Sequence, residues 1–122
     1  MGRVDRRRQL GQLGEQVASR YLIAQGYRLL DRNWRCRLGE IDLVAAHADQ
    51  IIFVEVRTRS GMRFGSGAES VDGHKQLRLR RLALAYLREK RLPPDAKLRF
   101  DVVSIRLLED GRYEVDHIKH AF

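Results

Sequence analysis

Two short apolar runs with carboxylates at alternating positions constrain the fold of this chain more than any other feature. The first run spans residues 39–45 and the second spans residues 50–58. Successive side chains of a β-strand point to opposite faces, so each run predicts a strand with a charged face. A hairpin that turns at residues 48–49 places Asp42 directly opposite Glu55, with their Cβ atoms about 5 Å apart.

Two carboxylates at this separation repel each other unless a cation lies between them. A hard divalent metal ion suits the position, because it takes oxygen ligands and keeps coordination positions open for water and phosphate. Phe53 and Val54 indicate burial around Glu55, where an unpaired carboxylate would be costly. The alternative is a polar sheet edge or a salt bridge, for instance between Glu40 and Arg57.

The spacing of Asp42, Glu55 and Arg57 resembles the PD-(D/E)xK nuclease superfamily, in which an Asp and a Glu bind a metal ion and a third residue, usually Lys, acts at the scissile phosphate. Other segments, in matching order from about residue 9 to residue 120, resemble an uncharacterised bacterial family called YraN. These segments are Gly11–Ala18, Gly26–Tyr27, Arg32–Arg35, Gly39–Val44, Phe53–Arg57, Lys75 and Arg99–Val103. The resemblance implies a restriction endonuclease-like fold, similar to that of archaeal Holliday-junction resolvases.

The resemblance also implies a metal site. Asp42 and Glu55 are its expected ligands, with Mg²⁺ or Mn²⁺ as the expected ion. Glu15 belongs to the first expected helix and is a candidate third ligand or an acceptor for metal-bound water. A solvated Glu15, paired locally with Arg20 or Gln12, is an equally open alternative.

Arg57 departs from the superfamily pattern, in which this position usually holds Lys. Arginine stays charged under ordinary conditions and therefore cannot act as a general base. It can still bind a phosphate and stabilise charge in a phosphoryl transition state. Two possibilities remain: catalysis in which the metal lowers the pKa of bound water, or a domain that binds nucleic acid without cutting it.

The charge of the chain favours a polyanionic partner. It has 24 Lys and Arg against 16 Asp and Glu, a formal net charge of +8. Each phosphate contact made by a basic side chain releases condensed counterions. The expected nucleic-acid contacts follow the second strand or begin the second helix, where free backbone N–H groups attract phosphate: Arg57, Arg59, Lys75, Gln76 and Arg78. A solvated helix face is the alternative for Lys75 and Arg78.

The rest of the chain predicts an α/β fold in the order α-β-β-β-α-β-β. The expected fold is a restriction endonuclease-like αβββαβ core, a mixed sheet flanked by helices, with an added C-terminal strand. Asp101 is assigned a structural role, paired with an arginine of the second helix. A Gly-rich stretch over residues 59–72 predicts a mobile, functional loop. The elements are expected at residues 10–25, 27–33, 38–45, 50–58, 73–90, 98–107 and 113–118.

Residues 1–8 are expected to form a mobile basic arm, and residues 9–122 a single domain. No apolar stretch approaches the roughly 20 residues that span a bilayer, and the first residues lack a signal-peptide core. A single cysteine, Cys36, excludes an internal disulfide and fits a reducing cytoplasm. We therefore expect a cytoplasmic protein without a membrane partner.

Three functions are compatible with these features. The leading one is a metal-dependent endonuclease that hydrolyses phosphodiesters of DNA, including branched or damaged structures. The alternative is a non-catalytic nucleic-acid-binding domain with a degenerate nuclease site, an accessory subunit of a DNA-processing complex. A third is a partner-binding domain whose basic surface meets an acidic protein. Junction resolvases commonly dimerise, so the resemblance also raises the expectation of a homodimer.

Overall fold

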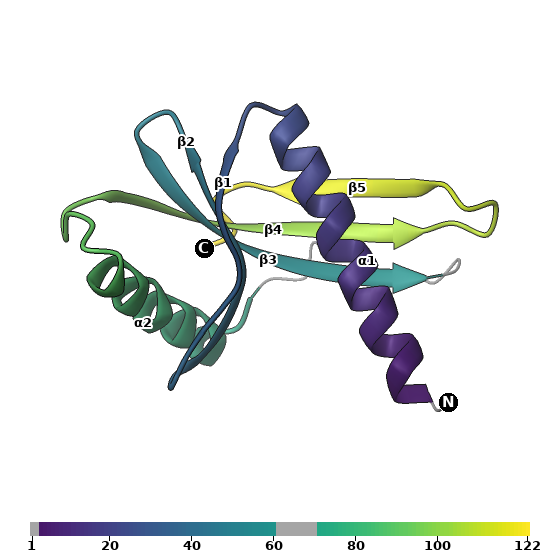
Figure 1. Ribbon diagram of the computed structural model, residues 1–122, viewed down its shortest axis with the longest axis horizontal. Coiled ribbons are helices and arrows are strands. Elements are labelled where there is room, and N and C mark those ends of the chain that lie inside the picture. Colours follow the sequence, from purple (N-terminus) through teal and green to yellow (C-terminus); the bar gives the residue numbers. More distant parts are fainter. Residues whose placement is uncertain (1–2, 61–70) are drawn as a thin grey trace.

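The computed structural model describes residues 3–60 and 71–122, and the predicted order of elements is confirmed within them (Figure 1). The described strands form one five-stranded sheet in the order β1-β2-β3-β4-β5. Strands β3 and β4 are parallel, whereas the other neighbouring strands are antiparallel. This is the restriction endonuclease-like mixed sheet, with β5 as the added C-terminal strand. The elements are α1 (Arg3–Ala24), β1 (Arg28–Cys36), β2 (Gly39–His47), β3 (Gln50–Ser60), α2 (Gly73–Glu89), β4 (Lys97–Leu107) and β5 (Tyr113–Ile118).

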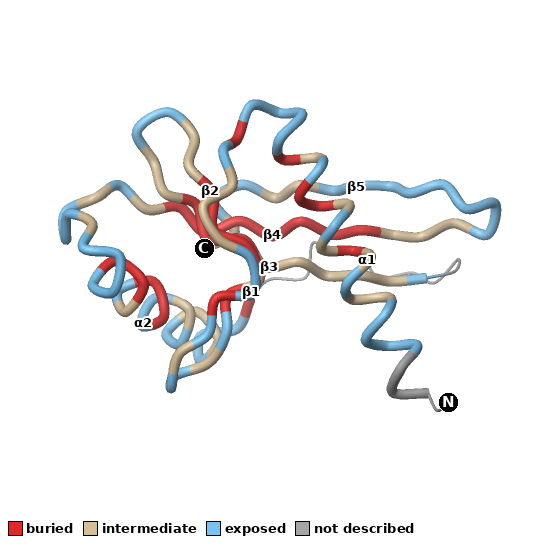
Figure 2. Tube along the Cα trace, viewed as in Figure 1, coloured by how far each residue is buried: buried red, intermediate tan, exposed pale blue. Residues whose placement is uncertain are grey.

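The two helices cover opposite faces of the sheet. From α1, Ala18 and Leu22 pack in a core that also contains Leu43, Ile52 and Val103 of the strands. From α2, Leu82 and Tyr86 pack in a second core that contains the alternate strand residues Val44, Phe53 and Phe100. Strand β4 is buried along most of its length between these cores, while β5 at the sheet edge is largely exposed (Figure 2).

The N-terminal helix is longer than the sequence pattern indicates. Helix α1 begins at Arg3 and so includes residues 3–8 of the expected basic arm; the mobility of that segment stays a prediction. Gly26, with φ of 92°, follows the helix in the left-handed conformation typical of a helix end. No helix in the described part of the chain is long and apolar enough to cross a membrane. Most of the expected mobile loop, residues 61–70, lies outside the described residues.

The hairpin of β2 and β3 has the predicted register. Its ladder runs from the pair His47–Gln50 to the pair Leu43–Val54, so one further step brings Asp42 opposite Glu55. At that step the backbone pairing is replaced by a side chain, because the Val56 N–H donates a hydrogen bond to Asp42 Oδ2 (2.9 Å). The two strands therefore separate at the carboxylates.

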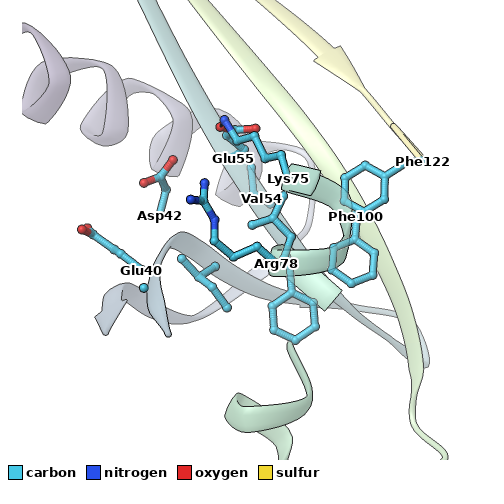
Figure 3. Close-up of a pocket in the computed structure, with 12 residues that line it drawn as sticks. Glu40, Asp42, Val54, Glu55, Lys75, Arg78, Phe100 and Phe122 are labelled. Atoms are coloured by element: carbon cyan, nitrogen blue, oxygen red, sulfur yellow. Dashed lines mark ion pairs between the residues drawn. The ribbon is translucent and has the colours of Figure 1, made fainter. Parts of the chain in front are cut away.

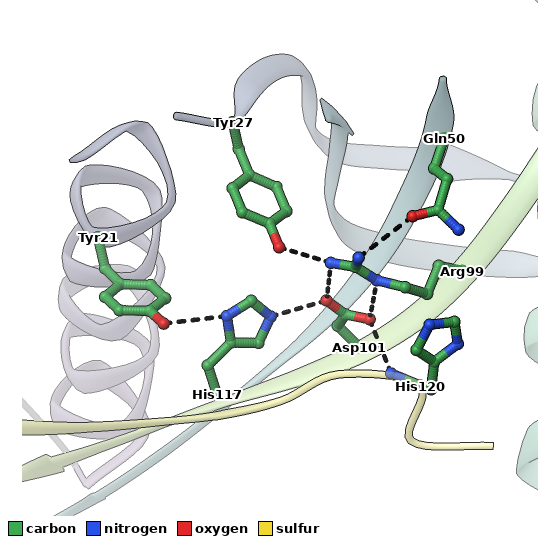
Figure 4. A network of polar contacts seen from close by, with 7 residues as sticks. All are labelled: Tyr21, Tyr27, Gln50, Arg99, Asp101, His117 and His120. Carbon is green, nitrogen blue, oxygen red and sulfur yellow. Dashed lines mark hydrogen bonds and ion pairs between the residues drawn. The ribbon is translucent and has the colours of Figure 1, made fainter. Parts of the chain in front are cut away.

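Asp101 is structural, as expected, but its predicted pairing with an arginine of α2 is wrong. The buried Asp101 carboxylate instead accepts two hydrogen bonds from Arg99, two residues away on the same face of β4 (2.9 and 2.8 Å). His117 of β5 lies 2.7 Å from the same carboxylate, and its other ring nitrogen lies 3.0 Å from the Tyr21 hydroxyl of α1 (Figure 4). Arg99 also donates to the Tyr27 hydroxyl (2.5 Å), so this network connects α1, the residue before β1, β4 and β5.

Candidate functional site

A cavity of about 280 Å³ opens where β2 and β3 separate, between the sheet and the first turns of α2 (Figure 3). Asp72 determines where this helix begins, because its side chain accepts a hydrogen bond from the Lys75 N–H (2.9 Å). Lys75 and Arg78 then lie one turn apart on α2 and extend toward the strands. The charged residues that line the cavity are Glu40, Asp42, Glu55, Lys75 and Arg78.

Asp42 is the most strongly perturbed carboxyl group of the cavity. Burial raises its pKa from 3.8 to about 6, against the lowering effect of the Val56 N–H bond. The charges of Glu15, Glu55 and Glu40 raise the pKa further. Ionised Asp42 is thus held in surroundings that lack sufficient positive charge, which is the condition under which a bound cation would be stabilising.

Glu55 has a cation near each carboxylate oxygen, yet one of the two oxygens accepts no hydrogen bond in the described part of the chain. Its Oε1 pairs with Lys75 Nζ, and its Oε2 lies 3.7 Å from a guanidinium nitrogen of Arg57. Oε2 is buried and has no hydrogen-bond partner among the described residues. A buried carboxylate oxygen without a donor is costly, so this atom is suited to a ligand that the protein itself does not supply.

Glu15 lies close to the same site from α1. Burial raises its pKa, a hydrogen bond with the Asn33 side chain lowers it, and the charge of Glu40 raises it again. Asn33 lies on β1 between the pairs Arg32–Leu43 and Trp34–Ile41, which places it opposite Asp42. Its φ of 50° is uncommon for a residue other than glycine and distorts β1 beside the carboxylates.

The sequence profile of the uncharacterised protein family UPF0102 matches residues 14–105, three quarters of the chain. The chain belongs to the UPF0102 family. A UPF0102 protein of Moorella thermoacetica is 53% identical over 117 residues, covering 95% of this chain and 97% of the relative. One of Parafrankia sp. is 51% identical over 113 residues, covering 93% and 95%. The expected membership of the YraN family, which is the UPF0102 family, is confirmed.

The donor set of this UPF0102 protein fits a magnesium-type ion. Mg²⁺ is commonly held by one or two carboxylates together with water and substrate phosphate, and Asp42 and Glu55 offer such a pair. Glu55 Oε2 accepts no hydrogen bond in the described part of the chain, although the Arg57 guanidinium lies 3.7 Å from it. Within residues 3–60 and 71–122, no group of three His, Cys, Asp or Glu side chains is arranged to hold a metal. The three predicted ligands are therefore not grouped as one metal site in these residues. Asp42 and Glu55 would be the protein ligands, and the role of Glu15 as a third ligand or as an acceptor for metal-bound water stays a prediction.

The five expected nucleic-acid contacts differ in their positions. Lys75 and Arg78 line the cavity, and Arg57 lies beside Glu55. Gln76 instead donates from Nε2 to the Val71 carbonyl (2.6 Å), so its amide is used in holding the segment before α2. Arg59 lies two positions beyond Arg57 on β3.

The apolar lining of the cavity was missed by the sequence reasoning. It includes Phe53, Leu79, Phe100 and Phe122, which come from β3, α2, β4 and the end of the chain. Asn33 was also missed. Its position in a strand with a polar, turn-favouring side chain is a weak signal, whereas nothing in the local sequence indicates that Phe122 returns to the cavity.

Proposed function

We propose that this protein is a metal-dependent endonuclease that hydrolyses phosphodiesters of DNA at the cavity between β3 and α2. The observation that carries the proposal is the convergence of Asp42 and Glu55 at the separation of two strands, with one Glu55 oxygen lacking a hydrogen-bond partner in the described residues. Both carboxylates are flanked by side chains suited to phosphate, because Lys75 and Arg78 line the same cavity.

In the proposed reaction, Asp42 and Glu55 hold the metal ion. A bound Mg²⁺ or Mn²⁺ would lower the pKa of a bound water molecule and would neutralise charge on the phosphate. Arg57 and Lys75 position the scissile phosphate and stabilise the additional negative charge of the transition state. Lys75 pairs with Glu55 in the absence of substrate. In the complex, Lys75 would instead contact the phosphate and Glu55 would bind the metal ion.

The competing function is a nucleic-acid-binding domain that does not cut. Arg57, which cannot accept a proton, is the observation in its favour. The raised pKa of Asp42 is the observation against it, because a carboxyl group kept in unfavourable surroundings is typical of sites with a chemical task. The presence of three carboxylates in the cavity, Glu40, Asp42 and Glu55, would also weaken simple binding of phosphate.

Nicking of branched, flapped and duplex DNA with Mg²⁺ or Mn²⁺ tests the proposal. We expect Asp42→Ala and Glu55→Ala to abolish cleavage while keeping or raising DNA affinity, because they remove negative charge near phosphate. Arg57→Lys should keep activity, whereas Arg57→Ala should lose it. Variants purified in parallel with the wild type control for contaminating nucleases. If the wild type and Arg57→Lys cut none of these substrates, the protein is a binding domain and the proposal fails.

A further inference from the structure

The apolar end of the cavity contains an ordered row of aromatic rings that the metal chemistry does not use. The Phe53 and Phe100 rings are stacked, with centroids 5.5 Å apart and an interplanar angle of 25°. Phe100 and Phe122 are stacked in the same way, with centroids 4.8 Å apart and the same angle. Phe53 and Phe100 are buried, whereas Phe122 is partly exposed. The row therefore leads from the core to a ring at the rim of the cavity.

Three basic side chains of α2 lie near this row of rings. The Arg80 guanidinium carbon lies 5.3 Å from the centroids of both Phe100 and Phe122. Lys75 and Arg78, on the same helix, line the cavity between the rings and the carboxylates, as Figure 3 shows. An occupant of the cavity should thus be flat and aromatic, and a negatively charged group attached to it would face Lys75 and Arg78, while a bound metal ion would offset Glu40, Asp42 and Glu55.

The size of the cavity limits the occupant to a single group. A volume of about 280 Å³ is just below the usual range of ligand pockets, which is roughly 300–1,000 Å³. It has room for one base but not for a stacked base pair with its backbone. A base can enter only if it leaves the stack of the duplex, which costs least where the base is already unpaired.

We propose that this cavity binds one unpaired nucleobase of DNA, stacked on Phe122, next to the phosphate that lies at Asp42 and Glu55. The inference rests on the proposed function, since it takes the carboxylates as the position of the scissile phosphate. Stacking on an aromatic ring accepts every base, because every base has a π-face. The substrate class is therefore DNA with an unpaired nucleotide adjacent to the cut, at a branch point, flap or bulge, in preference to intact duplex.

Affinities of the wild type and two variants for two DNA duplexes, measured without metal, test the subsite independently of cleavage. Fluorescence anisotropy gives the affinity for a duplex with one unpaired nucleotide and for the same duplex with an abasic residue at that position. The wild type should bind the intact nucleotide roughly tenfold more tightly, a ratio within the range of base–aromatic stacking. Phe122→Leu, which keeps an apolar side chain but removes the ring, should reduce the ratio to about one. Tyr113→Leu, a change of an exposed aromatic residue on β5, should leave it at the wild-type value.

The abasic comparison keeps the proposal testable even if Phe122→Leu folds poorly, because it changes only the DNA. A ratio near one for the wild type would assign the cavity to another occupant, such as an apolar side chain of a partner protein, and would overturn the proposal. An unchanged ratio in a folded Phe122→Leu would overturn it as well. A Phe122-dependent ratio without any cleavage would support the subsite while the endonuclease proposal fails. Equal cleavage of intact duplex and of DNA with an unpaired nucleotide, together with an affinity ratio near one, would support the endonuclease proposal and overturn the subsite.

Discussion

At the scale of single residues, Asp42 shows the conflict between stability and chemistry most clearly. Its carboxylate accepts the Val56 N–H where the β2–β3 ladder ends, and it is also close to three other carboxylates. The backbone bond favours the ionised form, but burial and the neighbouring charges disfavour it by more, which is why its pKa is about 6. A residue that served only to close the hairpin could be a neutral amide.

We expect Asp42→Asn to stabilise the protein at pH 8. The native pKa of about 6 lies above the ordinary value of 3.8, so the native state holds its proton more tightly than the unfolded state does. The stability that this group contributes is present below pH 3.8 and is lost as the pH rises through 6. Removal of the charge should therefore add about 1–3 kcal/mol to the free energy of unfolding at pH 8 and almost nothing at pH 4. Urea denaturation at both values measures the difference.

Asp49→Asn is the matched control for this experiment. Asp49 is an exposed aspartate whose pKa is lowered by its hydrogen bond with Lys97. Its replacement should change stability little at pH 8, because water screens an exposed ion pair and leaves it little net stabilisation. Mg²⁺ should stabilise the wild type more than Asp42→Asn, since an ion that binds only the folded state raises its stability. A loss of stability in Asp42→Asn at pH 8 would contradict the account of this site.

At the scale of elements, the position of α1 on the sheet depends on one close approach. Gly14 lies against Thr58 of β3, whose Cβ and Cγ2 would be 2.8 Å from an added Cβ at this position. The next residue, Glu15, is the one that comes near the carboxylates. The absence of a side chain at Gly14 thus allows α1 to lie close enough to β3 for Glu15 to reach the site.

Gly14→Ala should destabilise the protein by about 1–3 kcal/mol, the usual cost of inserting a methyl group into a packed interface. It should also reduce cleavage more than this loss of stability explains, because α1 must move and carry Glu15 with it. Gly11→Ala, one turn earlier in the same helix, is the control. An added Cβ there meets nothing within 4 Å, so the change should stabilise by roughly 0.5–1 kcal/mol through helix propensity. Thermal unfolding of both variants compares them, and equal effects would exclude the close approach as the cause.

The elements also show how far the sequence determines this structure. The β2–β3 register could be predicted because a two-residue turn at Ala48 and Asp49 and the alternating pattern both specify it. Helix α2 was equally predictable, from the helical spacing of its apolar stripe, of which Leu82, Tyr86 and Leu87 are buried. These signals are local. The contact between Lys75 and Glu55 and the return of Phe122 depend on how distant segments pack, for which a single sequence contains no periodic signal.

At the scale of the whole molecule, the net charge of +8 can be related to the site by comparing basic residues at the cavity with basic residues away from it. The proposed phosphate contacts Lys75 and Arg78 lie on α2 at the cavity, while Arg112 lies in the loop between β4 and β5, paired with Asp110 (2.6 Å). If the charge excess serves general solubility, replacing a basic residue at either place should change DNA affinity equally. If it serves DNA binding at the cavity, replacements at Lys75 and Arg78 should change the affinity more than a replacement at Arg112.

Charge reversal separates these two explanations. We expect DNA affinity of the wild type to fall steeply as salt is raised, because release of counterions from the phosphates supplies most of the binding free energy. Replacement of Lys75 and Arg78 by Glu should weaken binding and reduce the slope of log affinity against log salt by about two, since each lost phosphate contact removes nearly one unit. Arg112→Glu should leave both the affinity and the slope close to those of the wild type. Anisotropy titrations of one duplex over a salt series measure all three proteins. If Arg112→Glu reduces the slope by half as much as the double reversal on α2, each basic residue contributes equally. DNA would then be attracted by the charge of the whole surface, and the assignment of the phosphate to the cavity would be wrong.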